Sequence, residues 1–327
     1  MLKAGVVGCG NVIGTRHAQE YISHERTELV CVCDLIREKA DSLAEKLGTK
    51  AYYSVHDMLQ EEDLDVVSVC TTDTKHYEPT MQCLEKRVHV LCEKPLAMNS
   101  EEAAKMVQKA REIGCFLGVN YNRRFSPFYT RGHRLVQQGK LGKLAYLDMK
   151  LCQGGEYAFN RGQGKYYLLF ELQVHSLDML RYFGGEVEEV YAQFTNPAQR
   201  PIYTTCIIQL RFCTGALGTL IGSYDGGFSH PIERLEVGGV RGYLVVDNVM
   251  DGLHLCLHER EEEQVWKSNM LQKCDFSLTF SNHIKTFIDR VSEGKNPPIT
   301  GMDGLRSLQI AEAAVRSFRE HISVKPY

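Results

Sequence analysis

Hydrophobic and polar positions follow one pattern up to about residue 120. Short apolar runs predict buried strands, and they alternate with stretches whose apolar positions recur at helical spacing. Strands that alternate with helices pair in parallel, which predicts a doubly wound α/β sheet. The predicted strands are residues 4–7, 28–33, 50–53, 65–70, 88–92 and 116–120, and helices are predicted from residue 11, over 36–47 and 55–59, up to residue 86, and from a Ser100 cap.

The pattern changes after residue 120, where strands follow one another with few helices between them. Turn signals separate these strands, which predicts an α+β domain with a large, mostly antiparallel open sheet. We therefore expect a dinucleotide-binding domain over 1–122 and a substrate-binding and oligomerisation domain over 123–327. The predicted strands here are 145–151, 188–194, 204–212, 216–224, 233–237, 242–246 and 253–258, and the helices are 127–138, 170–182, 276–292 and 304–321.

Two glycines, Gly8 and Gly10, directly follow the first predicted strand and precede a helix. The first allows a tight turn, and the second lets a pyrophosphate approach the backbone at the helix N-terminus. This context predicts a Rossmann dinucleotide site, although Ile13 occupies the third position of the pattern, where a small residue is usual, and Gly14 comes one residue later. The predicted contacts from this segment are Gly8, Gly10, Asn11, Val12 and Ile13.

Asp34 ends the second predicted strand at the spacing expected for a ribose-binding carboxylate. A carboxylate there favours NAD over NADP because it repels a 2′-phosphate, whereas Arg37 nearby leaves NADP possible. The alternative for Asp34 is a helix N-cap, and both roles can coexist.

Lys94 and His175 are the candidates for chemistry. Lys94 lies between Glu93 and Pro95 at a strand end, and its bond to the proline is a candidate for the cis isomer. On a helix, Glu171 and Asp178 would share a face with His175, so Glu171 could tune that imidazole. A base, an ammonium and a nicotinamide together fit hydride transfer from a carbinol: His175 would take the hydroxyl proton, and Lys94 would stabilise the oxygen. The alternatives are a surface lysine and a structural histidine.

Composition narrows the classes of partner. The chain has 327 residues, of which 43% are hydrophobic and 24% charged, and a net charge of -3. This charge predicts no nucleic-acid or membrane partner, and the start of the chain shows no signal-peptide pattern. The 12 cysteines form no C-x-x-C pair, so we expect buried free thiols in the cytoplasm and no metal site.

These motifs together resemble the Gfo/Idh/MocA family of oxidoreductases, which act mostly on sugars, sugar derivatives and cyclitols. The resemblance covers the whole chain, and its most specific motif is Glu93-Lys94-Pro95. It implies a catalytic role for Lys94, His175 and Glu171, and a homodimer or homotetramer formed through the second sheet. Implied cofactor contacts are Thr71, Thr72, His76, Glu93, Lys94 and Asn120; implied substrate contacts are Lys94, Arg123, Arg124, Glu171 and His175. Family members commonly have Asp at the position of Glu171.

Three hypotheses follow. The first is a dehydrogenase that transfers a hydride between NAD and a secondary hydroxyl of a sugar, glycoside or cyclitol. The second is a redox-neutral enzyme whose bound NAD oxidises a sugar transiently. The third is a non-catalytic NAD-binding sensor. We expect substrate specificity to lie in the loop over 154–167, with Tyr157, Asn160, Arg161 and Tyr167 as candidates for packing against pyranose faces.

Overall fold

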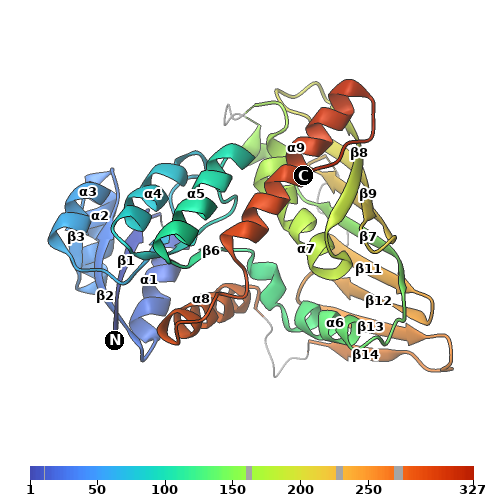
Figure 1. Ribbon diagram of the computed structural model, residues 1–327, viewed down its shortest axis with the longest axis horizontal. Coiled ribbons are helices and arrows are strands. Elements are labelled where there is room, and N and C mark those ends of the chain that lie inside the picture. Colours follow the sequence, from blue (N-terminus) through green and yellow to red (C-terminus); the bar gives the residue numbers. More distant parts are fainter. Residues whose placement is uncertain (11, 160–163, 226–230, 269–274) are drawn as a thin grey trace. The chain divides into compact units, whose positions relative to one another are not determined.

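A computed structural model describes residues 1–10, 12–159, 164–225, 231–268 and 275–327, so the predicted contacts Asn11, Asn160 and Arg161 lie outside the described residues. The chain forms two compact units (Figure 1). One unit comprises residues 1–121 and 280–306, and the other comprises residues 122–279 and 307–327. The predicted boundary after residue 122 assigned residues 280–306 to the second domain, whereas they pack with the first unit.

The first unit is built on a six-stranded parallel sheet with the order β3-β2-β1-β4-β5-β6. This order confirms the predicted doubly wound sheet, in which ligands bind at the carboxyl ends of the strands. Its strands are β1 (Leu2–Val7), β2 (Thr27–Cys33), β3 (Lys50–Tyr52), β4 (Val66–Val69), β5 (His89–Cys92) and β6 (Leu117–Val119). Its helices are α1 (Ile13–Ser23), α2 (Arg37–Leu47), α3 (Val55–Glu61), α4 (Tyr77–Glu85), α5 (Ser100–Ile113) and most of α8 (Ser277–Ser292).

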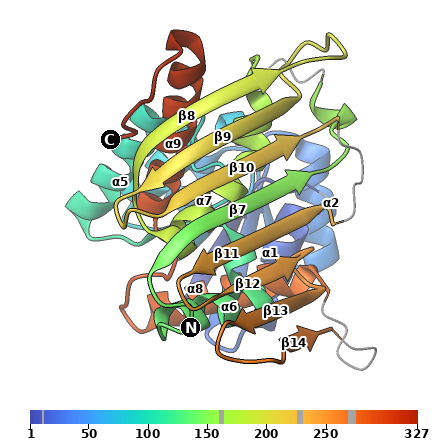
Figure 2. The same ribbon diagram turned by 90° about the vertical axis from the view of Figure 1, so that its right-hand side faces the viewer.

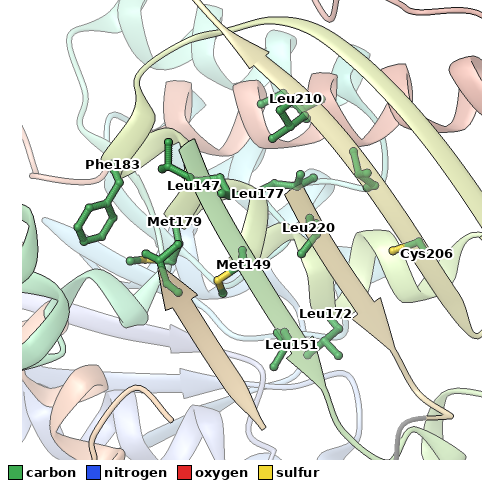
Figure 3. Packing of buried hydrophobic residues seen from close by; sticks show 14 of the residues in the cluster. Leu147, Met149, Leu151, Leu172, Leu177, Met179, Phe183, Cys206, Leu210 and Leu220 are labelled. Carbon is green, nitrogen blue, oxygen red and sulfur yellow. The ribbon is translucent and has the colours of Figure 1, made fainter. Parts of the chain in front are cut away.

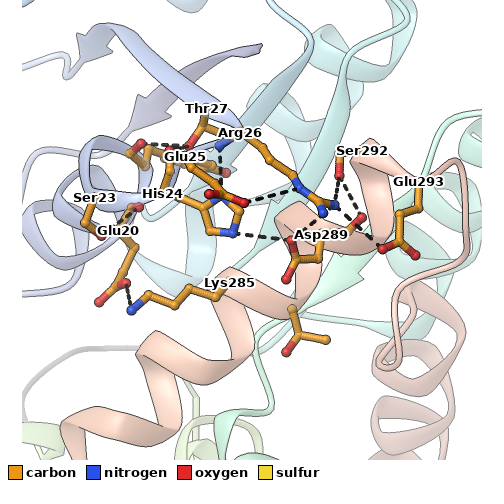
Figure 4. Close-up of polar contacts among 12 residues, drawn as sticks. Glu20, Ser23, His24, Glu25, Arg26, Thr27, Lys285, Asp289, Ser292 and Glu293 are labelled. Carbon is orange, nitrogen blue, oxygen red and sulfur yellow. Dashed lines mark hydrogen bonds and ion pairs between the residues drawn. The ribbon is translucent and has the colours of Figure 1, made fainter.

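Helix α8 joins the first unit mainly through apolar contacts. Ile284, Phe287 and Ile288 are fully buried in the same core as α1 and α2. At the edge of this core, the carboxylate of Asp289 lies 3.4 Å from the guanidinium of Arg26 (Figure 4). Ion pairs between exposed groups contribute little to stability, so the buried aromatic and aliphatic side chains account for most of the attachment. These contacts explain why a C-terminal helix completes an N-terminal domain.

The second unit is built on an eight-stranded sheet with the order β14-β13-β12-β11-β7-β10-β9-β8 (Figure 2). All neighbours pair antiparallel except β7 and β10, which confirms the predicted mostly antiparallel sheet. The strands are β7 (Leu144–Cys152), β8 (Val187–Thr195), β9 (Thr205–Phe212), β10 (Leu217–Ser223), β11 (Glu233–Gly239), β12 (Gly242–Asp247), β13 (Gly252–Leu257) and β14 (Gln264–Lys267).

One face of this sheet forms the core of the second unit. Leu147, Met149 and Leu151 of β7 pack with Leu177 of α7 (Val174–Gly184), as Figure 3 shows. Helices α6 (Pro127–Gln137) and α9 (Gly301–Glu320) contribute further residues to this core. The described helices of the second unit, α6, α7 and α9, pack on that face, and in Figure 2 none of them covers the other face.

Two local predictions were wrong, and one strand was missed. The side chain of Asn99, not Ser100, caps α5 by accepting a hydrogen bond from the backbone N–H of Glu102, at 2.8 Å. Gly238 and Gly239, which the predicted strand 233–237 left out, belong to β11, because their missing side chains leave room for Tyr146 and for the backbone at Leu141. Strand β14 was not predicted, since its four residues pair with β13 alone and are only partly buried.

Candidate active site

The glycine turn has the geometry that a bound dinucleotide requires. Gly8 has a φ of +100°, and a Cβ on it would lie 2.5 Å from the carbonyl carbon of Cys70. Only glycine therefore fits at this position. Among the described residues, no heavy atom lies within 4 Å of a Cβ built on Gly10, so the backbone there faces open space. The turn leads into α1, whose N-terminal N–H groups suit an anionic phosphate.

Gly14 supplies the small residue that position 13 lacks. A Cβ on Gly14 would lie 2.0 Å from the carbonyl oxygen of Gly8, so α1 packs against the turn only with glycine there. Ile13 instead packs, partly buried, against the core of the first unit. The pattern is thus G-x-G-x-x-x-G, in which Gly14 provides the close packing of α1 against the turn. Val12 is 65% exposed beside this turn.

Asp34 connects the glycine turn to the start of α2. Its Oδ2 accepts a hydrogen bond from the backbone N–H of Cys9 at 2.8 Å, and its Oδ1 accepts one from Ile36 at 2.9 Å. The N-cap position of α2 is Ile36, so Asp34 shapes the approach to the helix without being its cap. Arg37 stacks its guanidinium over the ring of Tyr53, with 4.0 Å to the centroid. The carboxylate and the guanidinium both lie at the carboxyl end of β2.

Glu93 directly follows β5 and lies in a buried hydrogen-bond network directly before Lys94. Its Oε1 accepts hydrogen bonds from His17 Nε2 at 2.9 Å and from Asn120 Nδ2 at 2.5 Å. His17 also contacts Ser68 Oγ at 2.8 Å, and His283 contacts Asn120 Oδ1 at 2.7 Å. Directly or through His17 and Asn120, the network links α1, β4, α8 and the residue after β6 to one carboxylate, which fixes the backbone that carries Lys94.

This network keeps Glu93 ionised. Burial opposes ionisation, but hydrogen bonds and the charge of His17 outweigh it and hold the pKa of the Glu93 carboxyl below its usual value. The hydrogen bond from Asn120 and the charge of Lys94 lower this pKa further. A buried carboxylate with several donors is stable in its charged form. The Lys94–Pro95 bond is cis, the isomer for which it was a candidate.

His76 connects the turn after β4 to the segment after Lys94. It is 1% exposed, with Nδ1 at 2.6 Å from the carbonyl oxygen of Pro95 and Nε2 at 3.1 Å from that of Thr71. Burial lowers the pKa of His76, although both carbonyl contacts oppose this effect. A neutral imidazole donates from only one nitrogen. His76 thus links the turn of Thr71 and Thr72 to the segment that follows Lys94. The resemblance implied cofactor contacts from both segments.

Glu171 does not continue the α-helix of His175. It lies in a π-helical segment, Leu169–Gln173, and α7 begins only at Val174. The predicted common face of Glu171, His175 and Asp178 assumed one α-helical repeat, and the π-helical turn breaks this repeat before His175. The Oε2 of Glu171 accepts hydrogen bonds from Tyr224 at 2.7 Å and Tyr157 at 3.0 Å. Tyr224 was not among the predicted site residues, because it follows β10, far away in sequence.

The two arginines after β6 both bind carboxylates within the second unit. Arg124 donates to both carboxylate oxygens of Asp178, at 2.8 and 2.5 Å, in the bidentate geometry typical of strong ion pairs. Arg123 donates to Glu233 at 2.6 Å. His175 is 6% exposed in α7, one helical turn before Asp178. A substrate contact from either arginine stays a prediction, while their carboxylate partners are a structural finding.

The cysteines are the next candidates for reactive side chains. The eleven described cysteines are all free thiols, and eight of them are buried. Burial raises the pKa of Cys9, for example, to about 12, with the charge of Asp34 adding to the shift. Such thiols are poor nucleophiles at neutral pH.

Within the described part of the chain, every helix is too short or too polar to span a membrane.

Family models match most of the chain. Residues 2–121 match a model described as an oxidoreductase family with an NAD-binding Rossmann fold, and residues 129–245 match the GFO/IDH/MocA C-terminal domain. The chain belongs to the Gfo/Idh/MocA family. It is an oxidoreductase, and its first unit is an NAD-binding Rossmann domain. The predicted family, fold class and cofactor are confirmed.

Individual relatives agree with this assignment. The chain is 29% identical to myo-inositol 2-dehydrogenase of Thermotoga maritima over 332 residues, which cover 99% of this chain and 98% of that protein. It is 38% identical to D-glucoside 3-dehydrogenase of Escherichia coli over 191 residues, covering 56% of this chain and 54% of that protein. A levoglucosan dehydrogenase solved with NADH and levoglucosan has the same fold, with a TM-score of 0.87, 19% identity and 99% coverage of both chains.

Proposed function

We propose that this member of the Gfo/Idh/MocA family oxidises a secondary hydroxyl of a sugar, glycoside or cyclitol with NAD. The observation that carries the proposal is Lys94, which follows a buried, ionised Glu93 at the carboxyl end of a strand in an NAD-binding domain. Relatives named as inositol and glucoside dehydrogenases support this substrate class.

The residues present fit NAD. Gly10 leaves room for close approach of a pyrophosphate, and α1 offers its N-terminus beside it. Asp34 stands where a ribose carboxylate is expected, and it disfavours the 2′-phosphate of NADP. Seven further residues remain proposed to contact the cofactor or to position the residues that do: Val12, Ile13, Arg37, Thr71, Thr72, His76 and Asn120. When bound, NAD supplies the acceptor for the hydride from the substrate carbinol.

We assign the chemistry to three side chains of the protein. The imidazole of His175 accepts the proton of the substrate hydroxyl as its C–H bond gives up the hydride. Lys94 donates a hydrogen bond to the same oxygen and stabilises the negative charge that develops there. Glu171 binds a neighbouring hydroxyl, because its carboxylate is already oriented by two tyrosine donors. Together these roles convert a secondary alcohol to a ketone.

A panel of sugars and cyclitols with NAD and NADP tests the function, with absorbance of the reduced cofactor as the readout. We expect NADH to form with at least one compound, and Lys94→Ala and His175→Ala each to lower kcat by at least about a hundredfold. Undiminished turnover in either variant would refute its assigned role. Cofactor that copurifies with the protein and sugar conversion without free NADH would instead favour the redox-neutral hypothesis. NAD binding with no conversion of any sugar would favour the sensor.

We also propose a homodimer or homotetramer formed through the outer face of the second sheet. Apolar side chains are exposed there on three neighbouring strands: Tyr146 of β7, Ile207 of β9 and Leu217 of β10 are 42%, 46% and 54% exposed. Burial of such a patch favours association. Light scattering tests this, since Leu217→Glu should shift the protein towards monomer; an unchanged mass would refute this interface. The free thiols support a cytoplasmic location.

A further inference from the structure

A cavity of about 550 Å³ lies in the second unit beside Glu171. Tyr157 and Tyr224 line it with their side chains, and the hydroxyls of both donate to the Glu171 carboxylate. The two tyrosines therefore connect the cavity to Glu171, which we place at the reacting sugar. Its volume lies within the range of roughly 300–1,000 Å³ that is common for small-molecule sites.

Three aromatic rings form the apolar wall of this cavity. The ring of Tyr224 lies edge-to-face with Tyr157 and Phe159, at centroid distances of 6.2 and 6.3 Å. Gly155 fits against the ring of Tyr224, since a Cβ there would lie 2.1 Å from it. Rings held at an angle to one another offer faces on which the C–H groups of a sugar ring can pack.

The polar groups of the cavity suit hydroxyls better than an anion. Arg200 stacks its guanidinium over Phe159 at 4.8 Å from the centroid, and within the described residues no carboxylate lies within 4 Å of it. Among the described residues, no carboxylate forms an ion pair with its guanidinium N–H groups. Glu156 and Asp225 add two carboxylates to the wall. One cation against two carboxylates disfavours a phosphate or carboxylate ligand, while donors and acceptors together fit a polyol.

We propose that this cavity, lined by Tyr157, Phe159, Arg200 and Tyr224, is a subsite for a second, uncharged pyranose ring joined to the ring that is oxidised. The substrate is then a glycoside with two sugar units rather than a free monosaccharide or cyclitol. This inference rests on the proposed function, because it places the reacting ring at Glu171. Binding energy from the second ring, remote from the reacting carbon, would raise kcat/KM.

The test compares a disaccharide with its constituent monosaccharide, for example cellobiose with glucose, in the wild type and in Arg200→Ala. Arg200 is exposed, so its removal is compatible with folding. We expect the wild type to prefer the disaccharide in kcat/KM, and Arg200→Ala to lower this preference about tenfold, as for one lost hydrogen bond to a charged group. Arg316→Ala, which removes an exposed arginine of α9 paired with Glu320, is the matched control and should leave the preference unchanged.

Two outcomes would overturn the subsite: equal kcat/KM for both sugars in the wild type, or an unchanged preference in Arg200→Ala. Failure of the proposed function has a different signature, namely no reduced cofactor with any sugar. In that case calorimetric titration of the NAD-loaded protein with the disaccharide decides the matter. Binding that weakens about tenfold in Arg200→Ala supports the subsite without the chemistry, and equal or undetectable binding refutes it.

Discussion

At the scale of single residues, two glycines of the same turn have separable roles. Gly14 packs where a Cβ would overlap the carbonyl oxygen of Gly8, while a Cβ on Gly10 meets no described atom within 4 Å. Gly14→Ala should therefore lower the free energy of unfolding by about 1–3 kcal/mol, as overpacking does. Gly10→Ala should fold normally and weaken NAD binding at least about tenfold, because the added methyl group occupies the space for the pyrophosphate.

Chemical denaturation and NAD titration of both variants check this difference. A stable Gly14→Ala, or a Gly10→Ala that binds NAD like the wild type, would contradict the assigned roles. The sequence already indicated a dinucleotide turn from Gly8 and Gly10. It did not indicate that Gly14 is the packing residue, because this depends on how α1 approaches the carbonyl of Gly8.

The buried pair of His17 and Glu93 allows a second residue-scale prediction. His17→Ala leaves the Glu93 carboxylate without its imidazole donor and should cost about 3–5 kcal/mol of stability. The double variant His17→Ala/Glu93→Gln should regain part of this loss, because no charge then remains buried beside Lys94. Urea unfolding of the two single variants and the double variant measures the coupling. Strictly additive losses would show that the two side chains do not interact.

At the scale of elements, the π-helical segment before α7 presents Glu171 to tyrosines from two other segments. Tyr224→Phe removes the shorter of these two hydrogen bonds and keeps the aromatic ring. We expect kcat/KM to fall about tenfold, because the carboxylate is less well oriented. Tyr191→Phe on β8 is a matched control that should have no effect. Equal activity of Tyr224→Phe and the wild type would show that Glu171 is held without Tyr224.

Sequence patterns predicted most elements but not the local geometry that builds the site. The apolar runs of β1, β4 and β5 and the alternating burial of β9 were readable, because burial dictates these patterns. The π-helical turn at Glu171 was not readable from the sequence, since the spacing of apolar residues is almost the same in an α-helix that contains one wider turn. Likewise, the contact of Tyr224 with Glu171 depends on how β10 and the helix pack, which spacing along the chain does not record.

At the scale of the whole molecule, fully and partly buried histidines should make stability depend on pH. Burial lowers the pKa values of His76, His89 and His133 below 6.5. The unfolded chain therefore binds protons as the pH falls through 6.5, whereas the folded chain does not, so stability is lost on acidification. The lowered pKa of Glu93 adds a loss in the same direction around and below pH 4.5.

Thermal unfolding between pH 7 and 5 measures this dependence. The melting temperature should fall as the pH falls, and His76→Gln should reduce the slope by removing one titrating group. His258→Gln, at an exposed position, is the control and should leave the slope closer to that of the wild type. A slope in His76→Gln as steep as in the wild type would show that His76 does not contribute to acid sensitivity.

The transfer of a hydride from a sugar carbinol to NAD is the central claim of this account, and isotope transfer tests it most directly. The sugar or cyclitol that the panel identifies is prepared with deuterium on the carbon to be oxidised and incubated with NAD and the wild-type protein. Mass spectrometry of the cofactor should then show one deuterium in the reduced nicotinamide, and Lys94→Ala should form this labelled cofactor at least about a hundredfold more slowly. Sugar oxidised without deuterium in the cofactor would contradict direct hydride transfer.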